Sequence, residues 1–483
     1  MKRAKRGIGL KDEGFEIKRV LEQLSREIED YYQDVERCNL MPDFDAHSIR
    51  VHLRENYDFE TPIPLEQLMN DVTRLMRHGN VQSSHPHYFG LYVPAARFPS
   101  IVADSLVALY NPQLGATTHS SAATEIEQFT LQFLASRLGL NPETCSANYT
   151  TGGTEANLTA VITALTKMFP DHGDRGVRSL PSLPVMYVSE EAHHSFNRIA
   201  SMTGLGCSAV RVISVNERFQ LDMQQLERQL GADRDEGYAP FLVVGTAGTT
   251  SAGIIDPLQE LADFCKDQRL WFHVDAACGG AAILSPRLRK HLVGIEKADS
   301  ITCDAHKWFS VSMGAGMFFC RHKDAVARAF SVRAPYLSKQ DEDVIEPYET
   351  TMQCSRRFIG LKVFMSIAEL GTTGFAEMIE KQSRLADLLQ KRLIEKNWLV
   401  VTSSPFAVVC FTHERIKSGE ISTNELLNRV YANRSVWISA TRLKGSIPVL
   451  RACITNFRTK ETDVDLLITE LDKAIELKLR NCD

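Results

Sequence analysis

The stretch SITCDAHKWF, residues 300–309, joins an apolar, β-branched segment to a polar end that carries Lys307. A strand interior seldom holds a lysine, because burying an unpaired ammonium costs several kcal/mol or shifts its pKa. A lysine with a depressed pKa is a good nucleophile toward carbonyls and forms Schiff bases. We therefore predict that Lys307 is such a lysine. For an isolated His-Lys pair the alternative is a surface lysine that follows a strand.

Three other apolar runs upstream also end in polar residues. VMYVSEEAHHS reaches His193, FLVVGTAGTT continues past Thr246, and LWFHVDAACGG contains Asp275. Helical segments such as residues 258–268 separate the runs, and this alternation predicts an α/β fold with a mostly parallel sheet covered on both faces. Ligands bind beyond the carboxyl ends of such strands. We expect these side chains and Lys307 to converge on one site.

A glycine turn precedes a helix in YTTGGTEANLTAVITAL, residues 149–165. Gly152 and Gly153 let a ligand approach the backbone closely, and Thr154 can cap the helix. Free N–H groups and the helix dipole make such a turn a candidate phosphate site. By itself the pattern is also typical of a plain turn.

Together these residues suit a cofactor that has an aldehyde, a phosphate and a basic ring nitrogen. Lys307 would bond the aldehyde, Asp275 would keep the ring nitrogen protonated, and His193 could stack on the ring. Pyridoxal 5'-phosphate meets this description. Taken singly, His193 could be a surface histidine and Asp275 could cap the next turn.

Composition excludes several other classes of protein. The 483 residues predict two or three domains, and the net charge of −5 argues against a basic nucleic-acid-binding face. No apolar run approaches the ~20 residues of a membrane span, and no signal peptide is evident. The eleven cysteines form no CxxC pair, which suits reduced thiols, such as Cys320 and Cys410, in a cytoplasmic protein. No histidine pair has zinc-motif spacing, so we expect no metal.

The pattern of the chain changes twice. Residues 1–80 read as helices whose apolar stripes pack on another domain or subunit, residues 81–369 as the large domain, and residues 370–483 as a small α+β domain.

The sequence resembles the group II pyridoxal-phosphate-dependent amino-acid decarboxylases. The matching stretches, in the order of the family, are HPHYFGLY, SSAATEIE, TTGGTEAN, EEAHHSF, GTAGTTSAGIIDPL, WFHVDAACGG, DAHKWF and VLRACIT, over about residues 82 to 460. The resemblance implies fold type I, the aspartate aminotransferase-like fold, and an obligate homodimer with sites at the interface.

The resemblance also implies roles for individual residues. Lys307 would hold the cofactor, Asp275 would meet the pyridine nitrogen, and His193 would stack on the ring. The phosphate neighbourhood would include Gly153, Thr154, Asp304 and His306, with Thr246 and Ala277 as ring contacts. The substrate side would include Tyr92, Val93 and Ala95, with Met313 approaching from the neighbouring subunit.

A tyrosine on a mobile loop returns a proton to the carbanion in this family. The corresponding region here is APYLSKQDEDVIEPYETTMQCSRRF, residues 334–358. Tyr348 is the first choice for this donor and Tyr336 the second, because the spacing of Tyr348 to Arg356-Arg357 differs slightly from the family pattern. His193 could share this role.

The resemblance implies decarboxylation of an L-amino acid to an amine. An oxidative aldehyde synthase of the same family is the nearest alternative, followed by an aminotransferase or lyase of the same fold and a catalytically silent binding protein. QCSRRF resembles the glutamate and cysteine-sulfinate branch, whereas DAHKWF and GTAGTTSAGIIDPL resemble bacterial aromatic decarboxylases. We lean slightly to an aromatic substrate. Arg97 could bind an acidic side chain, but a structurally paired arginine is the preferred interpretation.

Overall fold

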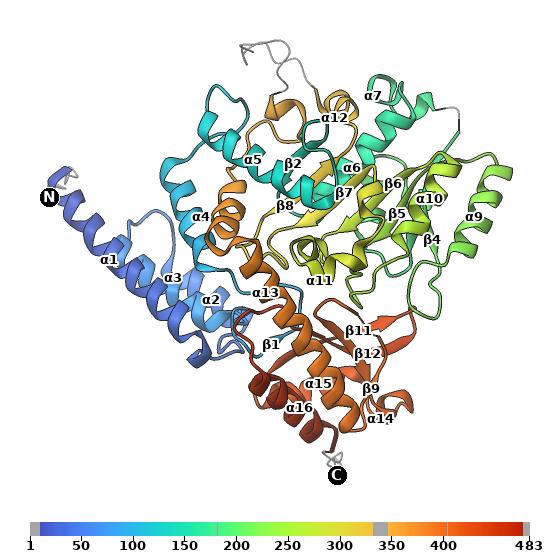
Figure 1. Cartoon of the computed structure of the whole chain (residues 1–483). Helices are drawn as coiled ribbons and strands as arrows, with labels where there is room; N and C mark the ends of the chain where they lie inside the picture. Colours follow the sequence, from blue (N-terminus) through green and yellow to red (C-terminus); the bar gives the residue numbers. More distant parts are fainter. Residues whose placement is uncertain (1–9, 181, 332–345, 403, 477–483) are drawn as a thin grey trace.

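Two sheets with helices packed on them make up the described part of the chain (Figure 1). The computed structural model describes residues 10–180, 182–331, 346–402 and 404–476. The larger of these sheets has seven strands in the spatial order β2 (Ser146–Thr150), β8 (Gly316–Cys320), β7 (Ser300–Asp304), β6 (Trp271–Ala276), β5 (Ala239–Thr246), β3 (Pro184–Ser189) and β4 (Val210–Ile213).

Most neighbouring strands of this sheet are parallel, and only β8 runs against its neighbours β2 and β7. The α/β class with a mostly parallel sheet is therefore confirmed. In this register Thr246 of β5 lies beside Asp275 of β6, and Asp275 lies beside Thr302 of β7. The polar strand ends predicted from the sequence thus meet at one edge of the sheet.

Helices cover both faces of the large sheet, which explains why its inner strands β3 and β6 are buried along their whole length. Leu242 and Val244 pack in one core cluster with α6 and α8, whereas Val243 between them packs in the other with α10. The helices of the sheet domain are α5 (Ser121–Leu138), α6 (Gly153–Met168), α7 (His172–Arg175), α8 (Ser195–Met202), α9 (Met223–Asp235), α10 (Leu258–Gln268), α11 (Pro286–Arg289) and α12 (Lys323–Phe330).

The second sheet is built mainly from the C-terminal part of the chain. Its order is β1 (Tyr88–Phe89), β11 (Trp437–Leu443), β12 (Ile447–Cys453), β10 (Val408–Thr412) and β9 (Leu399–Val400). Only β1 is parallel to its neighbour. The helices of this part are α13 (Gly360–Glu395), α14 (Glu414–Lys417), α15 (Thr423–Ala432) and α16 (Glu461–Glu476).

The domain limits at residues 80 and 369 stay predictions, but two elements join the proposed domains. β1, from the range assigned to the large domain, pairs with β11 of the C-terminal sheet. α13 begins at Gly360, before the predicted limit at residue 369, and bends at Gly371, whose φ is 65°. A glycine adopts this left-handed conformation without the penalty that a Cβ brings.

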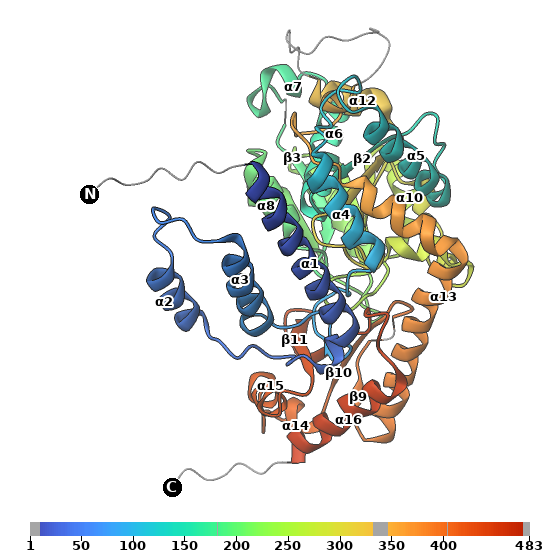
Figure 2. The same ribbon diagram turned by 90° about the vertical axis from the view of Figure 1, so that its left-hand side faces the viewer.

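The N-terminal helices α1 (Leu10–Asp34), α2 (Ala46–Asn56) and α3 (Leu65–Gly79) lie on one side of the molecule (Figure 2). Arg77 of α3 binds Glu27 of α1 through two nitrogens, at 2.7 and 2.9 Å. Several apolar side chains here are exposed, among them Leu21, Val72 and Met76. No helix in the described ranges has the length and apolar character to cross a membrane.

Candidate active site

A cavity of about 360 Å³ lies at the carboxyl ends of the strands of the large sheet, and we call it the strand-end pocket. Its lining residues are Thr151, Gly152, Gly153, Thr154, Glu155, Asn157, His193, Thr246, Gly248, Thr250, Asp275, Ala277, Cys278, Asp304, His306 and Lys307. The structure thus brings together all nine side chains and backbone positions predicted to form the cofactor site. They come from loops that are far apart in the sequence.

Lys307 follows β7 and its Nζ lies 3.1 Å from Asp304 Oδ2. Burial alone lowers the pKa of Lys307, but the nearby Cys278, Asp304 and Asp275 outweigh it and leave the pKa above its ordinary value. The predicted depressed pKa is therefore wrong. The reason is that Asp304, three residues earlier, pairs with the amine and stabilises its charged form.

Asp275 is buried at the end of β6, and two donors hold its carboxylate. Asn157 Nδ2 donates to Oδ2 at 2.9 Å, and the N–H of Ala277 donates to Oδ1 at 3.1 Å. The side-chain oxygen Asn157 Oδ1 lies 3.1 Å from His273 Nε2, and His273 Nδ1 lies 2.8 Å from Ser300 Oγ. A chain of buried polar groups therefore fixes the orientation of Asp275.

Asn157 was missed as a site residue by sequence reasoning. It lies in the stretch TTGGTEAN, four positions after Gly153 on α6, so it lies on the same face of the helix as the glycine turn. Burial lowers the pKa of its neighbour His273 to about 4. A neutral histidine at this depth completes the network without adding a second charge.

The glycine turn meets the start of α6 as predicted. A Cβ on Gly153 would lie 2.9 Å from Asp304 Oδ2 and 3.3 Å from Ala277 Cβ, so a side chain here would crowd the pocket. Thr151 donates to Glu155 Oε2 from its N–H at 2.9 Å and from its hydroxyl at 2.6 Å. Gln353 Nε2 donates to both oxygens of Glu155, at 2.9 and 3.1 Å. These contacts fix the turn at the edge of the cavity, which Thr151 and Glu155 also line.

His193 lies in the loop after β3, and its Nδ1 accepts a hydrogen bond from the N–H of Ser195 at 3.2 Å. Burial lowers the pKa of His193, so the ring is neutral at neutral pH. Thr246 ends β5 and donates its N–H to Asp256 Oδ2 at 2.8 Å. Burial raises the pKa of Asp256 to about 6.

His306 and Asp304 form the side of the pocket next to Lys307. His306 Nε2 lies 3.7 Å from Asp304 Oδ2, and His306 Nδ1 lies 3.0 Å from the carbonyl oxygen of Ala315. The other carboxylate oxygen, Asp304 Oδ1, is buried without a hydrogen-bond partner among the described residues. An unsatisfied buried acceptor of this kind is a place where a bound ligand can donate.

The predicted substrate-side residues do not line this pocket within the chain. Tyr92 and Ala95 are buried, Val93 is half-buried, and Met313 is 62% exposed. The Tyr92 ring meets Trp308 edge-on at 6.2 Å. Tyr348 is buried, with its N–H donating to the carbonyl oxygen of Gly115 at 3.0 Å, and it also does not line the pocket. Tyr336 lies outside the described residues.

Two arginines, Arg97 and Arg451, differ in whether a carboxylate pairs with them. Arg97 pairs with Glu369 and donates to the carbonyl oxygen of Ser366 at 3.2 Å, which confirms the structural interpretation of this residue. Arg451 on β12 is buried, and no carboxylate of the described residues lies within ion-pair distance of it. Its charge is close enough to influence the pKa of Cys278 in the pocket, which burial raises. Arg451 lies in the stretch VLRACIT, but no role was predicted for it from the sequence.

The pocket fits a phosphorylated aldehyde with a ring nitrogen. It offers a lysine amine, a fixed carboxylate, an unsatisfied buried acceptor, and a glycine turn at a helix N-terminus that a Cβ would fill. In the part of the chain that the structure describes, no three His, Cys, Asp or Glu side chains gather to hold a metal ion.

The family model described as the pyridoxal-dependent decarboxylase conserved domain matches residues 51–414. This range covers more than half of the chain and includes the whole strand-end pocket. The chain belongs to the pyridoxal-dependent decarboxylase family. Its cofactor is pyridoxal 5'-phosphate, and the protein is a carboxy-lyase.

Relatives of this decarboxylase differ in the substrates that their names give. The acidic amino acid decarboxylase of Homo sapiens is 28% identical over 430 residues, 86% of this chain and 81% of the relative. The aromatic-L-amino-acid decarboxylase of Bacillus atrophaeus is 28% identical over 446 residues, 89% of this chain and 90% of the relative. The crystal structure of Oryza sativa TDC with PLP and tryptamine has a TM-score of 0.87 at 24% identity over 98% of this chain and all of that one, which shows the shared fold. The predicted fold type I is confirmed.

Proposed function

We propose that this decarboxylase converts an L-amino acid to the corresponding amine and carbon dioxide, with an aromatic amino acid as the preferred substrate. The meeting of Lys307, Asp275 and His193 in one cavity carries this proposal. An acidic or unusual amino acid is the alternative substrate. An oxidative aldehyde synthase is the alternative reaction.

Pyridoxal phosphate supplies an aldehyde and a ring that accepts electrons from the substrate. Lys307 would hold the cofactor through its amine, and for this the amine would have to lose a proton and separate from Asp304. The Asp275 carboxylate, fixed by Asn157, would keep the ring nitrogen protonated. His193, whose pKa is lowered by burial, would stack on the ring.

The phosphate is proposed to lie at the start of α6, on Gly153 and Thr154, with Asp304 and His306 beside it. Backbone N–H groups and the helix dipole favour an anion there. Thr246 and Ala277 are proposed as contacts of the ring. Glu155 is turned to Thr151 and Gln353, so its charge is compensated by donors.

The substrate side is proposed to include Tyr92, Val93 and Ala95, with Met313 contributed by the neighbouring subunit. We add Arg451 as an anchor for a substrate carboxylate. A buried guanidinium is strongly destabilising without an anion, and a planar carboxylate can accept two of its donors. Gly90 and Ser439 already accept from Nη1, but Nε has no partner among the described residues.

The proton donor is proposed to be a tyrosine, with Tyr348 as first choice and Tyr336 as second. Replacing each tyrosine by phenylalanine distinguishes the two candidates. Only the replacement of the true donor should slow the return of the proton while cofactor binding stays unchanged. Loss of amine release in Tyr336→Phe with Tyr348→Phe unaffected would assign the role to Tyr336.

A cytoplasmic homodimer is also proposed. The exposed apolar side chains of α1 and α3 continue on α4 (Phe98–Tyr110), where Leu109 is 73% and Tyr110 77% exposed. Apolar surface on this scale marks an interaction face. Light scattering of the purified protein should give twice the 54.2 kDa mass of one chain.

The substrate is tested by incubating the holoenzyme with aromatic, acidic, branched and diamino L-amino acids. Mass spectrometry then follows amine and aldehyde separately. Amine from the aromatic group supports the proposal, whereas amine from the acidic group alone selects the alternative substrate. Aldehyde with oxygen uptake would replace the proposed reaction by the oxidative one.

A further inference from the structure

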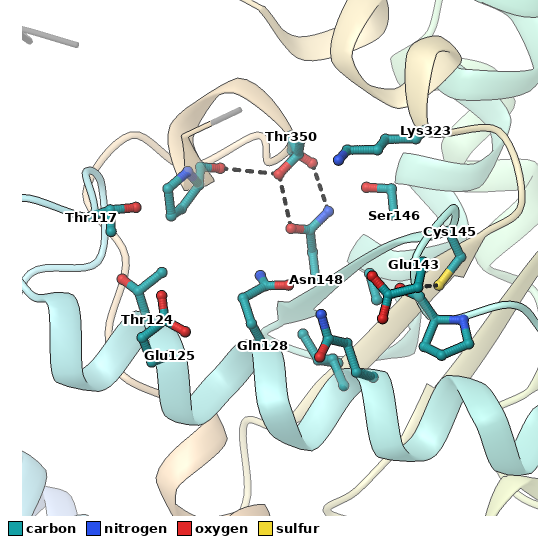
Figure 3. Close-up of a pocket in the computed structure, with 15 residues that line it drawn as sticks. Thr117, Thr124, Glu125, Gln128, Glu143, Cys145, Ser146, Asn148, Lys323 and Thr350 are labelled. Atoms are coloured by element: carbon teal, nitrogen blue, oxygen red, sulfur yellow. Dashed lines mark hydrogen bonds between the residues drawn. The ribbon is translucent and has the colours of Figure 1, made fainter. Parts of the chain in front are cut away.

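A second cavity of similar size lies near the opposite end of β2. It has a volume of about 390 Å³ and lies between α5, the beginning of β2, α12 and the segment 347–350 (Figure 3). We call it the α5 cleft. None of its lining residues is shared with the strand-end pocket. The α5 cleft therefore needs an explanation of its own.

The floor of the α5 cleft is polar and buried. Asn148 on β2 and Thr350 hold each other by two hydrogen bonds of 2.9 Å, from the Asn148 amide to the Thr350 carbonyl oxygen and from the Thr350 hydroxyl to the Asn148 oxygen. Thr124 on α5 is only 5% exposed, and its hydroxyl has no hydrogen-bond partner among the described residues. A buried hydroxyl without a partner is costly, so a ligand that pairs with it gains affinity.

The rim of the α5 cleft carries charges of both signs. Neither Lys323 on α12 nor Glu125 on α5 has an ion pair or a side-chain hydrogen bond within the described ranges. Figure 3 shows Lys323, Ser146 and a second carboxylate, Glu143, on one side of the cleft, and Thr124 and Glu125 on the side across from them. The cleft therefore offers one ammonium for a ligand carboxylate and, in Glu125 across from it, a carboxylate for a ligand ammonium, which favours a ligand that carries both charges.

We propose that the α5 cleft is a second ligand site, which binds a small zwitterion such as a free amino acid. The ligand carboxylate pairs with Lys323 and accepts from Ser146, and the ligand ammonium pairs with Glu125. Gln128, between the two walls, offers an amide to the middle of the ligand. A ligand with a single charge could form an ion pair with either Lys323 or Glu125, but not with both. This inference goes beyond the proposed function and does not depend on which reaction the strand-end pocket performs.

The test uses protein whose strand-end pocket is blocked by covalently attached cofactor, so that binding elsewhere can be measured. Holoenzyme is reduced with borohydride, which locks the cofactor on its lysine, and isothermal titration calorimetry then follows four probes. γ-Aminobutyrate and L-alanine are zwitterions of two lengths, while butyrate and butylamine carry one charge each. We expect one of the zwitterions to bind at least about tenfold more tightly than butyrate and butylamine, because each charge-assisted contact adds to affinity.

Two variants of opposite charge locate the binding. Lys323→Ala and Glu125→Gln should each weaken zwitterion binding at least about fivefold. Arg328→Ala removes a positive charge from the same helix outside the cleft and should leave binding unchanged. Circular dichroism checks that each variant is folded.

Three results would overturn the proposal. The first is the absence of binding of either zwitterion at millimolar concentration. The second is equal binding of zwitterions and singly charged probes. The third is Lys323→Ala and Glu125→Gln binding as well as the parent.

Discussion

The strand-end pocket and the α5 cleft have nearly the same volume, about 360 and 390 Å³, but their charges are organised in opposite ways. In the strand-end pocket the charged groups are paired, as in Lys307 with Asp304 and Asp275 with Asn157, and both of these carboxylates are buried. On the rim of the α5 cleft, Lys323 and Glu125 are exposed and have no partner within the described ranges. Volume alone therefore does not identify the reactive site. The preorganised network does, because groups fixed before the ligand arrives need no rearrangement at the moment of reaction.

One short segment connects the two cavities. Thr350 holds Asn148 at the floor of the α5 cleft, and three residues later Gln353 holds Glu155 beside the glycine turn. Both contacts reach across about two hundred residues of sequence. A change on one side of β2 can therefore reach the other through residues 350–353.

The largest expected effect distinguishes Lys307 from the other lysines of the protein. Lys307→Ala should abolish amine production, because no other amine takes its place in the pocket. Lys266→Ala, on the exposed side of α10, is the matched control and should retain activity. Amine release is measured by mass spectrometry with excess cofactor. Full activity in Lys307→Ala would remove the basis of the proposed function.

The next effect tests the paired charge in the strand-end pocket. Asp275→Asn keeps the shape of the side chain and removes its charge. Amine production should fall at least about a hundredfold, since losing a buried charge partner costs about 3 kcal/mol or more. Asp267→Asn on α10 is the control and should be unaffected. A loss of less than about threefold in Asp275→Asn would mean that the ring nitrogen needs no carboxylate.

The buried network also predicts a pH dependence of stability. The pKa of His273 is about 4 in the folded chain and near 6.5 when unfolded, so the unfolded chain takes up the proton first as the pH falls. This contribution is present above pH 6.5 and is lost as the pH falls toward 4, by about 2 kcal/mol between pH 7 and pH 5. Urea unfolding of the cofactor-free protein at the two pH values measures it.

His273→Gln should flatten that pH dependence by about the same amount, about 2 kcal/mol. Part of the slope should remain, because burial also lowers the pKa of His85 to about 4. An unchanged slope in His273→Gln would show that this histidine does not resist protonation in the folded chain.

The smallest effect concerns the connection between the cavities. Gln353→Ala removes the two hydrogen bonds from Gln353 to Glu155, while those from Thr151 remain. The dissociation constant of the cofactor should rise about fivefold, because a hydrogen bond to a charged group is worth about 1 kcal/mol or more. Gln224→Ala, exposed on α9, is the control. Cofactor binding is followed by fluorescence. An unchanged dissociation constant would show that residues 350–353 do not influence the cofactor site.

The strand-end pocket was largely predictable because parallel strands bring their carboxyl ends to one edge. His193, Thr246, Asp275 and Lys307 each follow an apolar run, and a local pattern marks each of them. The contact of Gln353 with Glu155 carries no such local pattern. The sign of the pKa shift of Lys307 was also wrong, since it depends on the geometry of Asp304 rather than on residue type.

The α5 cleft was not foreseen at all. Its residues are ordinary polar side chains from α5, β2, α12 and the segment 347–350, and only the packing of these elements gathers them. The pairing of β1 with β11 of the C-terminal sheet was also not predicted. Two residues that pair with Trp437 and Ile438 are too few to show an alternating pattern.

The most direct test of the central claim is the position of the cofactor on the chain. Purified holoenzyme is reduced with borohydride, digested, and mapped by mass spectrometry. The account predicts that the peptide containing Lys307, within SITCDAHKWF, carries the added mass of the reduced cofactor and that no other lysine is labelled. Labelling of a different lysine, or a cofactor that washes off after reduction, would contradict it.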